Sequence, residues 1–337
     1  MSDRHPVAGA LSIGTRKSQL ALVQTEHVRA RLQALFPSLQ LSVVGMSTKG
    51  DEVLDVALAK IGAKSLFTKE LEVALANKDV DLVVHSLKDM PTLLPDGMAI
   101  GAILEREDPR DAVVMSATLR DEGISRLDQL PEGAVIGTSS VRRIAQLKRR
   151  FPHLVFQDVR GNLNTRLAKL DAENGPYSAL LLAHAGLVRL NWHSRISQTL
   201  DADIILHAVG QGALGIEIRS DDATVQGIVG GLEHKDTALR CIAERAFMRG
   251  LEGGCSVPLG VWTELSRPSP STARLLLKGG VCSVDGSREI RHDHSIEFDE
   301  GTLDIAQQKQ LAQKLGHDLS VKFVELGAQD ILKEIRH

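Results

Sequence analysis

The sequence predicts an α/β protein built on mostly parallel sheets. From about Ala10 to Val209, short apolar runs alternate with longer amphipathic ones, which is the order typical of strand–helix–strand units. Of the 337 residues, 43% are hydrophobic and 25% are charged, an ordinary balance for a globular chain. A chain of this length is expected to form two or three domains.

Apolar runs bounded by Gly, Pro, Asp or Ser predict the strands of these domains. The expected strands are Leu39–Met46, Asp81–His85, Met98–Leu104, Ala112–Met115, Ala134–Gly137, Leu154–Val159 and Ala179–Ala183. Apolar positions three and four residues apart predict the helices that cover the sheets. The expected helices are Ser18–Phe36, Leu66–Ala76, Val141–Arg150, Leu163–Ala172 and Ala238–Leu251.

Two breaks in this pattern predict domain boundaries. The segment Glu105–Asp111 is highly charged and contains Pro109, as expected for a crossing between domains. A second break is expected near Leu232–Asp236, and after Cys255 the pattern changes to that of a small α+β domain. Its expected elements are the strands Ala273–Val284 and Glu289–Phe298 and the helices Ile305–Leu315 and Leu319–Leu326.

The composition argues against several classes of protein. Aromatic residues are only 3% of the chain, too few for base-stacking platforms, and the net charge of −3 gives no overall basic field, so no nucleic-acid partner is expected. No apolar stretch is long enough to span a bilayer and none follows a basic start, so we expect neither a membrane anchor nor a secretory signal. Three widely spaced cysteines form neither a disulfide framework nor a metal pattern, which fits a reducing, cytoplasmic location.

One polar segment follows a strand that is expected to be buried. In Val83–Pro91, the side chains of Ser86, Lys88 and Asp89 come just after the end of the strand, where open α/β sheets bind ligands. A carboxylate beside an ammonium group there can act as a general acid or base, or stabilise a cationic intermediate. The alternative is a surface Lys–Asp turn before a proline.

A second junction has the features of an anion site. In Gly137–Arg143 a strand ends in Thr138, Ser139 and Ser140 and a helix begins with Arg142 and Arg143. Free backbone N–H groups, hydroxyls and the helix dipole attract an anion. Cations at a helix N-terminus oppose the dipole, so two arginines there favour an anion partner over a plain helix cap.

Further basic residues lie at similar junctions. Arg160, Gly161 and Arg166 follow another strand, and Arg16, Ser18 and Gln19 lie near the N-terminus. Arg189 is expected to join the same ligand site. Because guanidinium groups bind carboxylates in pairs of hydrogen bonds, several of them together predict a ligand with many carboxylates or phosphates. The chain has no nucleotide-binding glycine motif, which favours a polycarboxylate, although ordinary solvated arginines are the alternative for Arg160–Arg166.

Cys255 is the cysteine best placed for chemistry. It lies in a glycine-rich turn after a predicted helix, where a thiol is accessible to a reactant, whereas Cys241 and Cys282 lie in helix and strand patterns. The histidines His85, His184 and His207 are too scattered to predict a metal site, and no metal is expected.

Six segments taken together resemble hydroxymethylbilane synthases, also called porphobilinogen deaminases, in order and spacing between about Leu11 and Gly260. The segments are Gly14–Leu20, His85–Pro91, Gly137–Arg143, Arg160–Asn162, Val209–Ala213 and Glu252–Cys255. The resemblance implies two periplasmic-binding-protein-like α/β domains facing each other across a cleft, plus a small C-terminal α+β domain. It also implies that the chain returns to the first domain after Gln211, which gives domains of residues 1–108 with 211–235, 109–210 and 236–337.

The resemblance also implies the chemistry and its residues. Cys255 would carry a dipyrromethane cofactor as a thioether, and this primer would be extended by four molecules of porphobilinogen before hydrolysis releases hydroxymethylbilane. Asp89 would be the catalytic carboxylate, with Lys88 and Arg16 beside it. The cofactor would be held by Ser86, Lys88, Asp89, Thr138, Ser139, Ser140, Arg142, Arg143, Arg160 and Gly161, and the substrate by Arg16, Ser18, Gln19, Lys64, Arg166 and Arg189.

The sequence departs from the family pattern beside Lys64. Ala63 and Ser65 stand where glycines are common in the family. The segment Ser47–Ala63, which comes just before Lys64, corresponds to a mobile segment of the family. Two other functions remain open from the residues alone: a binding protein for a dicarboxylate or oxyanion, and an acyl transferase with a cysteine nucleophile. The second would need a base beside the thiol, and no histidine is placed in sequence to suggest one. A monomer is expected.

Overall fold

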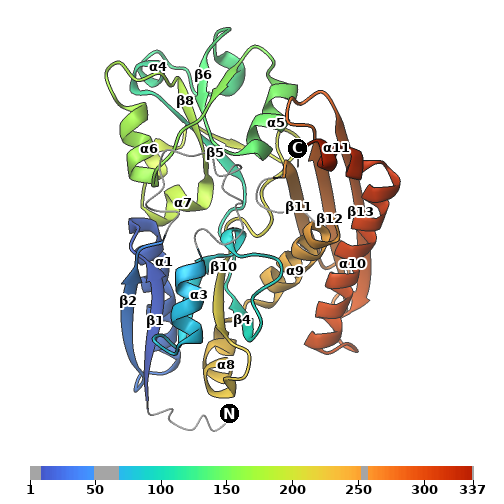
Figure 1. The fold of residues 1–337 in the computed structure, drawn as a ribbon. Coiled ribbons are helices and arrows are strands. Elements are labelled where there is room, and N and C mark those ends of the chain that lie inside the picture. The colour runs from blue at the N-terminus through green and yellow to red at the C-terminus, as the bar shows by residue number, and fades with distance from the viewer. Residues whose placement is uncertain (1–8, 49–67, 252–256, 336–337) are drawn as a thin grey trace. The chain divides into compact units, whose positions relative to one another are not determined.

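The computed structural model describes residues 9–48, 68–251 and 257–335. This part of the chain forms two compact units, one of residues 9–48, 68–106 and 213–238 and the other of residues 107–212 and 239–335. Each unit contains a five-stranded sheet, and the second also contains a three-stranded sheet (Figure 1). The predicted α/β class with a smaller C-terminal α+β part is confirmed. Among the described residues, none of the helices has the length and apolar character needed to span a bilayer.

The sheet of the first unit has the strand order β2-β1-β3-β10-β4. Its strands are β1 (Ala10–Arg16), β2 (Gln40–Met46), β3 (Leu82–Ser86), β4 (Met98–Ile103) and β10 (Leu214–Arg219). β1 is parallel to β2 and β3, whereas β10 is antiparallel to β3 and β4. The chain therefore returns after residue 213 to fill the space between two strands made much earlier.

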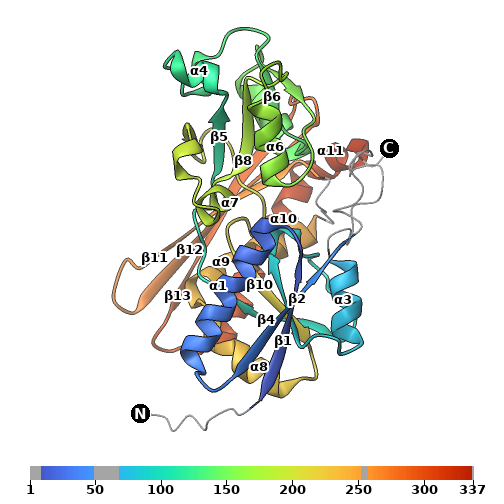
Figure 2. The ribbon, with the colours of Figure 1, turned by 90° about the vertical axis from the view of Figure 1, so that its left-hand side faces the viewer.

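Helices cover both faces of this first sheet. α1 (Gln19–Leu35) and α8 (Ala223–Val229) pack on the face that carries Leu82 and Val84, and α3 (Lys69–Ala76) packs on the face that carries Val83. Figure 2 shows α1 and α3 on opposite sides of the sheet. The alternation of side chains along β3 is the reason that both faces have an apolar core.

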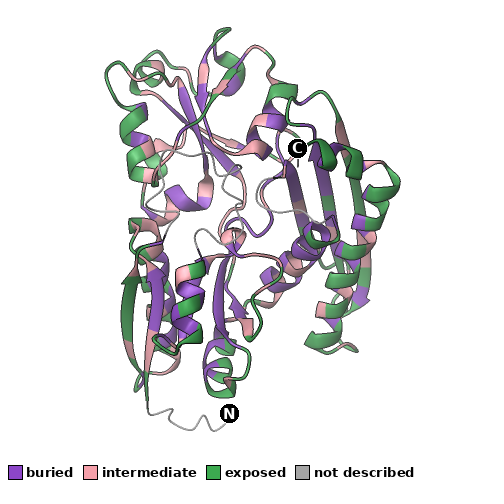
Figure 3. Ribbon diagram, in the orientation of Figure 1, coloured by how far each residue is buried: buried purple, intermediate pink, exposed green. Residues whose placement is uncertain are grey.

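The five-stranded sheet of the second unit has the order β7-β6-β8-β5-β9. Its strands are β5 (Asp111–Met115), β6 (Val135–Gly137), β7 (Val155–Gln157), β8 (Ala179–Ala183) and β9 (Gln198–Leu200). α5 (Val141–Arg150) packs on one face, and α6 (Leu163–Leu170) and α7 (His184–Arg189) pack on the other; a short α4 (Ala117–Asp121) follows β5. β5 and β10 are buried along their whole lengths (Figure 3).

The C-terminal part of the second unit is an antiparallel sheet covered by helices on one face. The strands β11 (Leu259–Ser266), β12 (Thr272–Cys282) and β13 (Glu289–Asp299) share a core with α9 (Lys235–Gly250), α10 (Ile305–Glu325) and α11 (Ala328–Ile335). The prediction of two helices over 305–326 is wrong, because α10 is continuous. Gly316 does not break it: a side chain at Gly316 would collide with the backbone of α9 at Ala243 and Phe247, so glycine permits the two helices to pack closely.

Asp111 also differs from its expected place in the charged crossing between domains. It is the first residue of β5 and is completely buried. The charged segment predicted as a crossing therefore ends one residue earlier, at Arg110.

Candidate active site

The segment after β3 presents two polar side chains between two buried apolar ones. Leu87 and Met90 are each only 1% exposed, whereas Lys88 and Asp89, in the 3-10 turn Leu87–Asp89, are half-buried. Leu87 and Met90 pack over Gly215 of β10, where a Cβ atom would lie 2.8 Å from Sδ of Met90. The apolar pair thus fixes the turn and leaves Lys88 and Asp89 directed away from the core.

The carboxylate of Asp89 differs from the other acidic groups near this edge in its contacts. Among the residues that the structure describes, no hydrogen bond or ion pair involves this carboxylate. A half-buried carboxylate with its acceptor sites unused can bind N–H groups and stabilise a developing positive charge.

The other predicted residues of the first unit lie at the same edge of its sheet. β1 and β3 are parallel neighbours, and Ile13 pairs with Leu82. Arg16 and Ser86 are therefore the last residues of two neighbouring strands. Ser18 caps α1 by accepting a hydrogen bond from the N–H of Ala21, and Gln19 is exposed in its first turn. The structure therefore brings Arg16, Ser18, Gln19, Ser86, Lys88 and Asp89 to one edge.

Gln24 fixes this edge from the side of α1. Gln24 is buried, and its Nε2 donates a hydrogen bond to Oγ of Ser86 at 3.0 Å. This bond holds the first turns of α1 against the end of β3.

The predicted residues of the second unit also lie at the ends of parallel strands. β6 is parallel to β7 and β8, and Thr138–Ser140, Arg160–Gly161 and α7 follow the ends of these three strands. Two bonds join the first two junctions: the N–H of Thr138 donates to the carbonyl of Gln157, and Oγ of Ser139 donates to the carbonyl of Val159 at 2.6 Å. Ser140 caps α5 by accepting from the N–H of Arg143.

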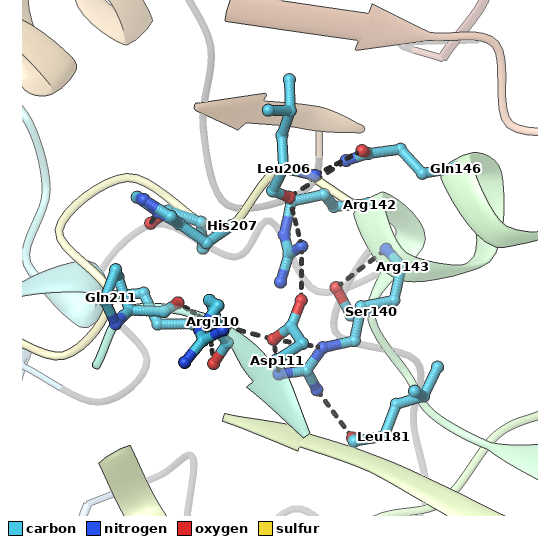
Figure 4. Close-up of polar contacts among 12 residues, drawn as sticks. Arg110, Asp111, Ser140, Arg142, Arg143, Gln146, Leu181, Leu206, His207 and Gln211 are labelled. Carbon is cyan, nitrogen blue, oxygen red and sulfur yellow. Dashed lines mark hydrogen bonds and ion pairs between the residues drawn. The ribbon is translucent and has the colours of Figure 1, made fainter. Parts of the chain in front are cut away.

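The two arginines that begin α5 bind a carboxylate of the protein itself (Figure 4). Nη1 of Arg142 donates to Oδ2 of Asp111 at 2.8 Å, and Nη2 of Arg143 donates to Oδ1 at 2.7 Å. Backbone carbonyls accept the next bonds, Leu206 from Arg142 and Leu181 from Arg143. The anion expected at this helix terminus is thus present within the fold as Asp111, which sequence reasoning had assigned to a crossing.

This cluster, Asp111 with Arg142 and Arg143, carries an excess of positive charge. Burial opposes ionisation of Asp111, but the two guanidinium groups outweigh it and hold its pKa well below the ordinary value. Two cations and one anion leave a net charge of +1 in a region where Arg142 is 5% and Arg143 6% exposed. A second carboxylate is the group that would balance this charge.

Two further residues fix the surroundings of the cluster. Nε2 of Gln211 donates to Oδ1 of Asp111 at 2.9 Å and to the carbonyl of Pro109 at 2.6 Å. Arg189 donates to the carbonyl of Gly212 at 2.7 Å, and burial lowers its pKa to about 10, so it remains charged at neutral pH. Segments 109–111 and 211–212 are therefore held side by side.

The remaining predicted residues lie on the loop and helix after β7. Nε of Arg160 lies 2.5 Å from Oδ2 of Asp158, and Nε of Arg166 donates to the carbonyl of Gly161. Gly161 has a φ of +103°, a conformation that requires glycine. Cys255 and Lys64, with most of the segment Ser47–Ala63, lie outside the described residues.

Sequence comparisons assign this chain to a family. The family model described as "Porphobilinogen deaminase, dipyromethane cofactor binding domain" matches residues 11–227, and the model of the porphobilinogen deaminase C-terminal domain matches residues 238–321. The chain belongs to the porphobilinogen deaminase family.

Relatives of this family match nearly the whole chain. The porphobilinogen deaminase of Nostoc sp. is 53% identical over 96% of this chain and 94% of its own length. That of Synechococcus elongatus is 52% identical over 97% of this chain and 96% of its own length. Among solved structures, the periplasmic VFT2 domain of Bordetella pertussis BvgS aligns at 15% identity, over 67% of this chain and 86% of that one, with a TM-score of 0.38.

Sequence reasoning missed several polar residues of this porphobilinogen deaminase fold. Asp111 was hidden among other charged residues, although its position directly before the apolar run Ala112–Met115 was a usable signal. Gln211 was quoted only as part of a motif, with no role. Glu217 lies in β10, a strand that was not predicted at all.

Proposed function

We propose that this protein is a hydroxymethylbilane synthase that uses Asp89 as its catalytic carboxylate. It joins four molecules of porphobilinogen head to tail. In each step the C–N bond of the aminomethyl group breaks and ammonia leaves. The methylene carbon then bonds to the free α-carbon of the acceptor pyrrole, which loses its α-proton. Hydrolysis finally releases hydroxymethylbilane. The observation that carries the proposal is the carboxylate of Asp89, which has no partner among the described residues and is held between the buried anchors Leu87 and Met90.

The roles of the residues at the edge of the first sheet follow from charge. Asp89 would accept hydrogen bonds from pyrrole N–H groups and stabilise the positive charge that develops as ammonia leaves. Lys88 and Arg16 lie beside it at the same edge and would bind substrate carboxylates, with Ser18, Gln19 and Ser86 as neutral partners. We assign the remaining substrate contacts to Arg166, Arg189 and Lys64.

The second unit fits the cofactor that the family model names. A dipyrromethane carries carboxylate side chains, and the buried net charge of +1 around Asp111, with the hydroxyls of Thr138, Ser139 and Ser140, suits such a group. Arg142, Arg143, Arg160 and Gly161 would complete its binding site, and Cys255 would hold it through a thioether. When bound, this group supplies the acceptor carbon for the first porphobilinogen.

The three-domain division predicted above is part of this proposal. The two five-stranded sheets would form the first two domains, and the part beginning at 236 would carry Cys255. A monomer and a cytoplasmic location are also proposed. The second is consistent with Cys241 and Cys282, which are both buried and form no disulfide bond in the described part of the chain.

The experiment that tests the proposal is the intact mass of the purified protein, followed by peptide mapping. We expect an excess mass equal to one dipyrromethane on the peptide that contains Cys255, and none on the peptides of Cys241 and Cys282. The variant Cys255→Ser should lack this mass and form no product from porphobilinogen.

The controls separate synthesis from simple binding. Cys241→Ser removes a buried thiol and should keep the modification. A wild-type protein that remains unmodified after incubation with porphobilinogen, and that binds it without releasing ammonia, would favour a binding protein and exclude the synthase.

A further inference from the structure

A buried group of ionisable side chains lies behind the turn that carries Asp89. His85 of β3 is 5% exposed, Glu217 of β10 is completely buried, and Glu72 of α3 is 7% exposed. Nε2 of His85 lies 2.8 Å from Oε2 of Glu217. The three residues come from three elements that pack together in the first unit, and none of them has a role in the reaction proposed above.

The two carboxylates of this group have unused oxygens. Oε1 of Glu217 and Oε1 of Glu72 are buried and have no hydrogen-bond partner among the described residues. Two ionised carboxylates with one imidazolium would leave a net negative charge in a dry interior, which is costly. In the described part of the chain, Arg219 of β10 is a buried cation that reaches α3, where it donates to the carbonyl of Leu75. A proton on one of the two carboxylates would balance the remaining negative charge.

Glu72 is the carboxyl of this group whose surroundings favour the neutral form. Burial raises the pKa of Glu72; the hydroxyl of Thr68 opposes this rise, and the charge of Glu217 adds to it. The smaller influences are those of His85, which lowers the pKa, and of Glu70 on the same helix, which raises it. Burial is the largest of these influences, so together they favour the neutral form of Glu72.

The position of His85 connects this group to the proposed site. His85 lies directly before Ser86, and its backbone pairs with Gly215, the residue over which Leu87 and Met90 pack. On the opposite face of β3, Ser86 bonds to Gln24. The end of β3 is therefore fixed on both faces, and on one of them the fixing interaction is the pair His85–Glu217.

We propose that His85, Glu217 and Glu72 form a buried proton-holding cluster that positions Lys88 and Asp89, with Glu72 protonated. They are positioning residues, because they are buried and would act through the turn that carries Lys88 and Asp89. The inference rests on the proposed function only for the effect of this positioning on the reaction. The protonation of Glu72 is a property of the fold and can be measured independently.

The first test separates kcat from KM for porphobilinogen. His85→Leu removes the bond to Glu217, and we expect kcat to fall about 10- to 100-fold with little change in KM, because a small displacement of a catalytic group mainly slows the chemical step. His85→Gln retains an N–H donor and should recover most of the activity. Equal kcat values in the wild type and His85→Leu would overturn the positioning role.

The matched control is Arg219→Met. Arg219 lies two residues after Glu217 on β10, is 9% exposed, and donates to the carbonyls of Leu75 and Val80 at 3.1 Å and 2.9 Å. Its loss should lower the melting temperature at least as much as His85→Leu while leaving kcat nearly unchanged. A similar fall of kcat in both variants would mean that general destabilisation, rather than the cluster, causes the effect.

The second test measures the proton on Glu72 without the reaction. A carboxyl whose pKa is raised by folding stabilises the protein fully at low pH, and this stability is lost as the pH rises through the folded-state pKa. Glu72→Gln imitates the protonated acid. Between about pH 5 and about pH 8, the melting temperature of this variant should therefore fall less than that of the wild type. Glu105→Gln, an exposed control in the same unit, should follow the wild type.

These readings distinguish the inference from the proposed function. A wild type that makes no product from porphobilinogen refutes the proposed function, and the melting curves then decide the protonation of Glu72 alone. If the melting temperatures of Glu72→Gln and the wild type fall by the same amount over this pH range, Glu72 holds no additional proton and the proposed cluster is refuted.

Discussion

Arg142 and Asp111 form a buried ion pair, with 2.8 Å between Nη1 and Oδ2. Arg143 binds the other oxygen of the same carboxylate. This relationship explains how two cations can begin α5 against its dipole: the first residue of β5 supplies their anion. The carboxylate is shared, so its removal affects both arginines at once.

Replacing Asp111 with asparagine should strongly destabilise the protein. Two buried guanidinium groups would lose their counter-charge, which costs about 3–5 kcal/mol in the free energy of unfolding. Urea unfolding measures this change. As a control, Asp128→Asn breaks the exposed pair Arg126–Asp128 and should have no measurable effect. A loss no larger than that of the control would mean that Asp111 is not needed to neutralise the arginines.

The same carboxylate predicts how stability depends on acid. The pKa of Asp111 is lower in the folded than in the unfolded protein, so its contribution is present above the unfolded value of about 4 and is lost as the pH falls below it. The difference in stability between the wild type and Asp111→Asn should therefore shrink between about pH 5 and about pH 3. A constant difference over this range would contradict the lowered pKa.

Replacing Asp89 with asparagine should nearly abolish turnover and leave the fold intact. The amide keeps the shape but removes the negative charge, so we expect kcat to fall at least about 100-fold. Ammonia release and circular dichroism measure the two properties. Asp96→Asn, at an exposed turn after the same segment, should retain full activity. An active Asp89→Asn variant would remove Asp89 from its assigned role.

Gly215→Ala should impair activity from the strand next to the site. The new Cβ would lie 2.8 Å from Sδ of Met90 and 2.9 Å from Cδ1 of Leu87, so the turn that carries Asp89 must shift. We expect a loss of about 1–3 kcal/mol in stability together with a reduced kcat. The control is Gly227→Ala in α8, where a Cβ meets nothing within 4 Å and stability should rise slightly. Unchanged kinetics of Gly215→Ala would show that the turn does not depend on this contact.

Local pattern was enough to predict most strands, helices and strand ends that carry polar side chains. Gly137–Arg143 was correctly interpreted as a strand followed by a capped helix, because strand, cap and helix are neighbours in sequence. The helix expected at 141–150 agrees with α5 to the residue. Resemblance then added the reaction, the substrate and the cofactor, which no local pattern specified.

The features that were missed depend on contacts between distant residues. β10 contains Glu217 and Arg219, whose charges interrupt its apolar pattern, and their burial is made possible by partners on β3 and α3. Asp111 looks exposed in sequence because its arginine partners come 31 and 32 residues later. The continuous helix α10 was predicted as two helices, and the close approach of α9 to Gly316 joins residues far apart in the chain.

The position of β10 also sets the order in which a newly made chain can fold. β3 and β4 leave the ribosome early, but the strand that must pair with both begins only at Leu214. The sheet from β5 to β9 ends at Leu200 and can therefore form first, although it comes later in the sequence. Until β10 is made, β3 and β4 have unpaired edges, which is the condition in which strands associate with other chains. Co-translational chaperones would be needed most during this interval.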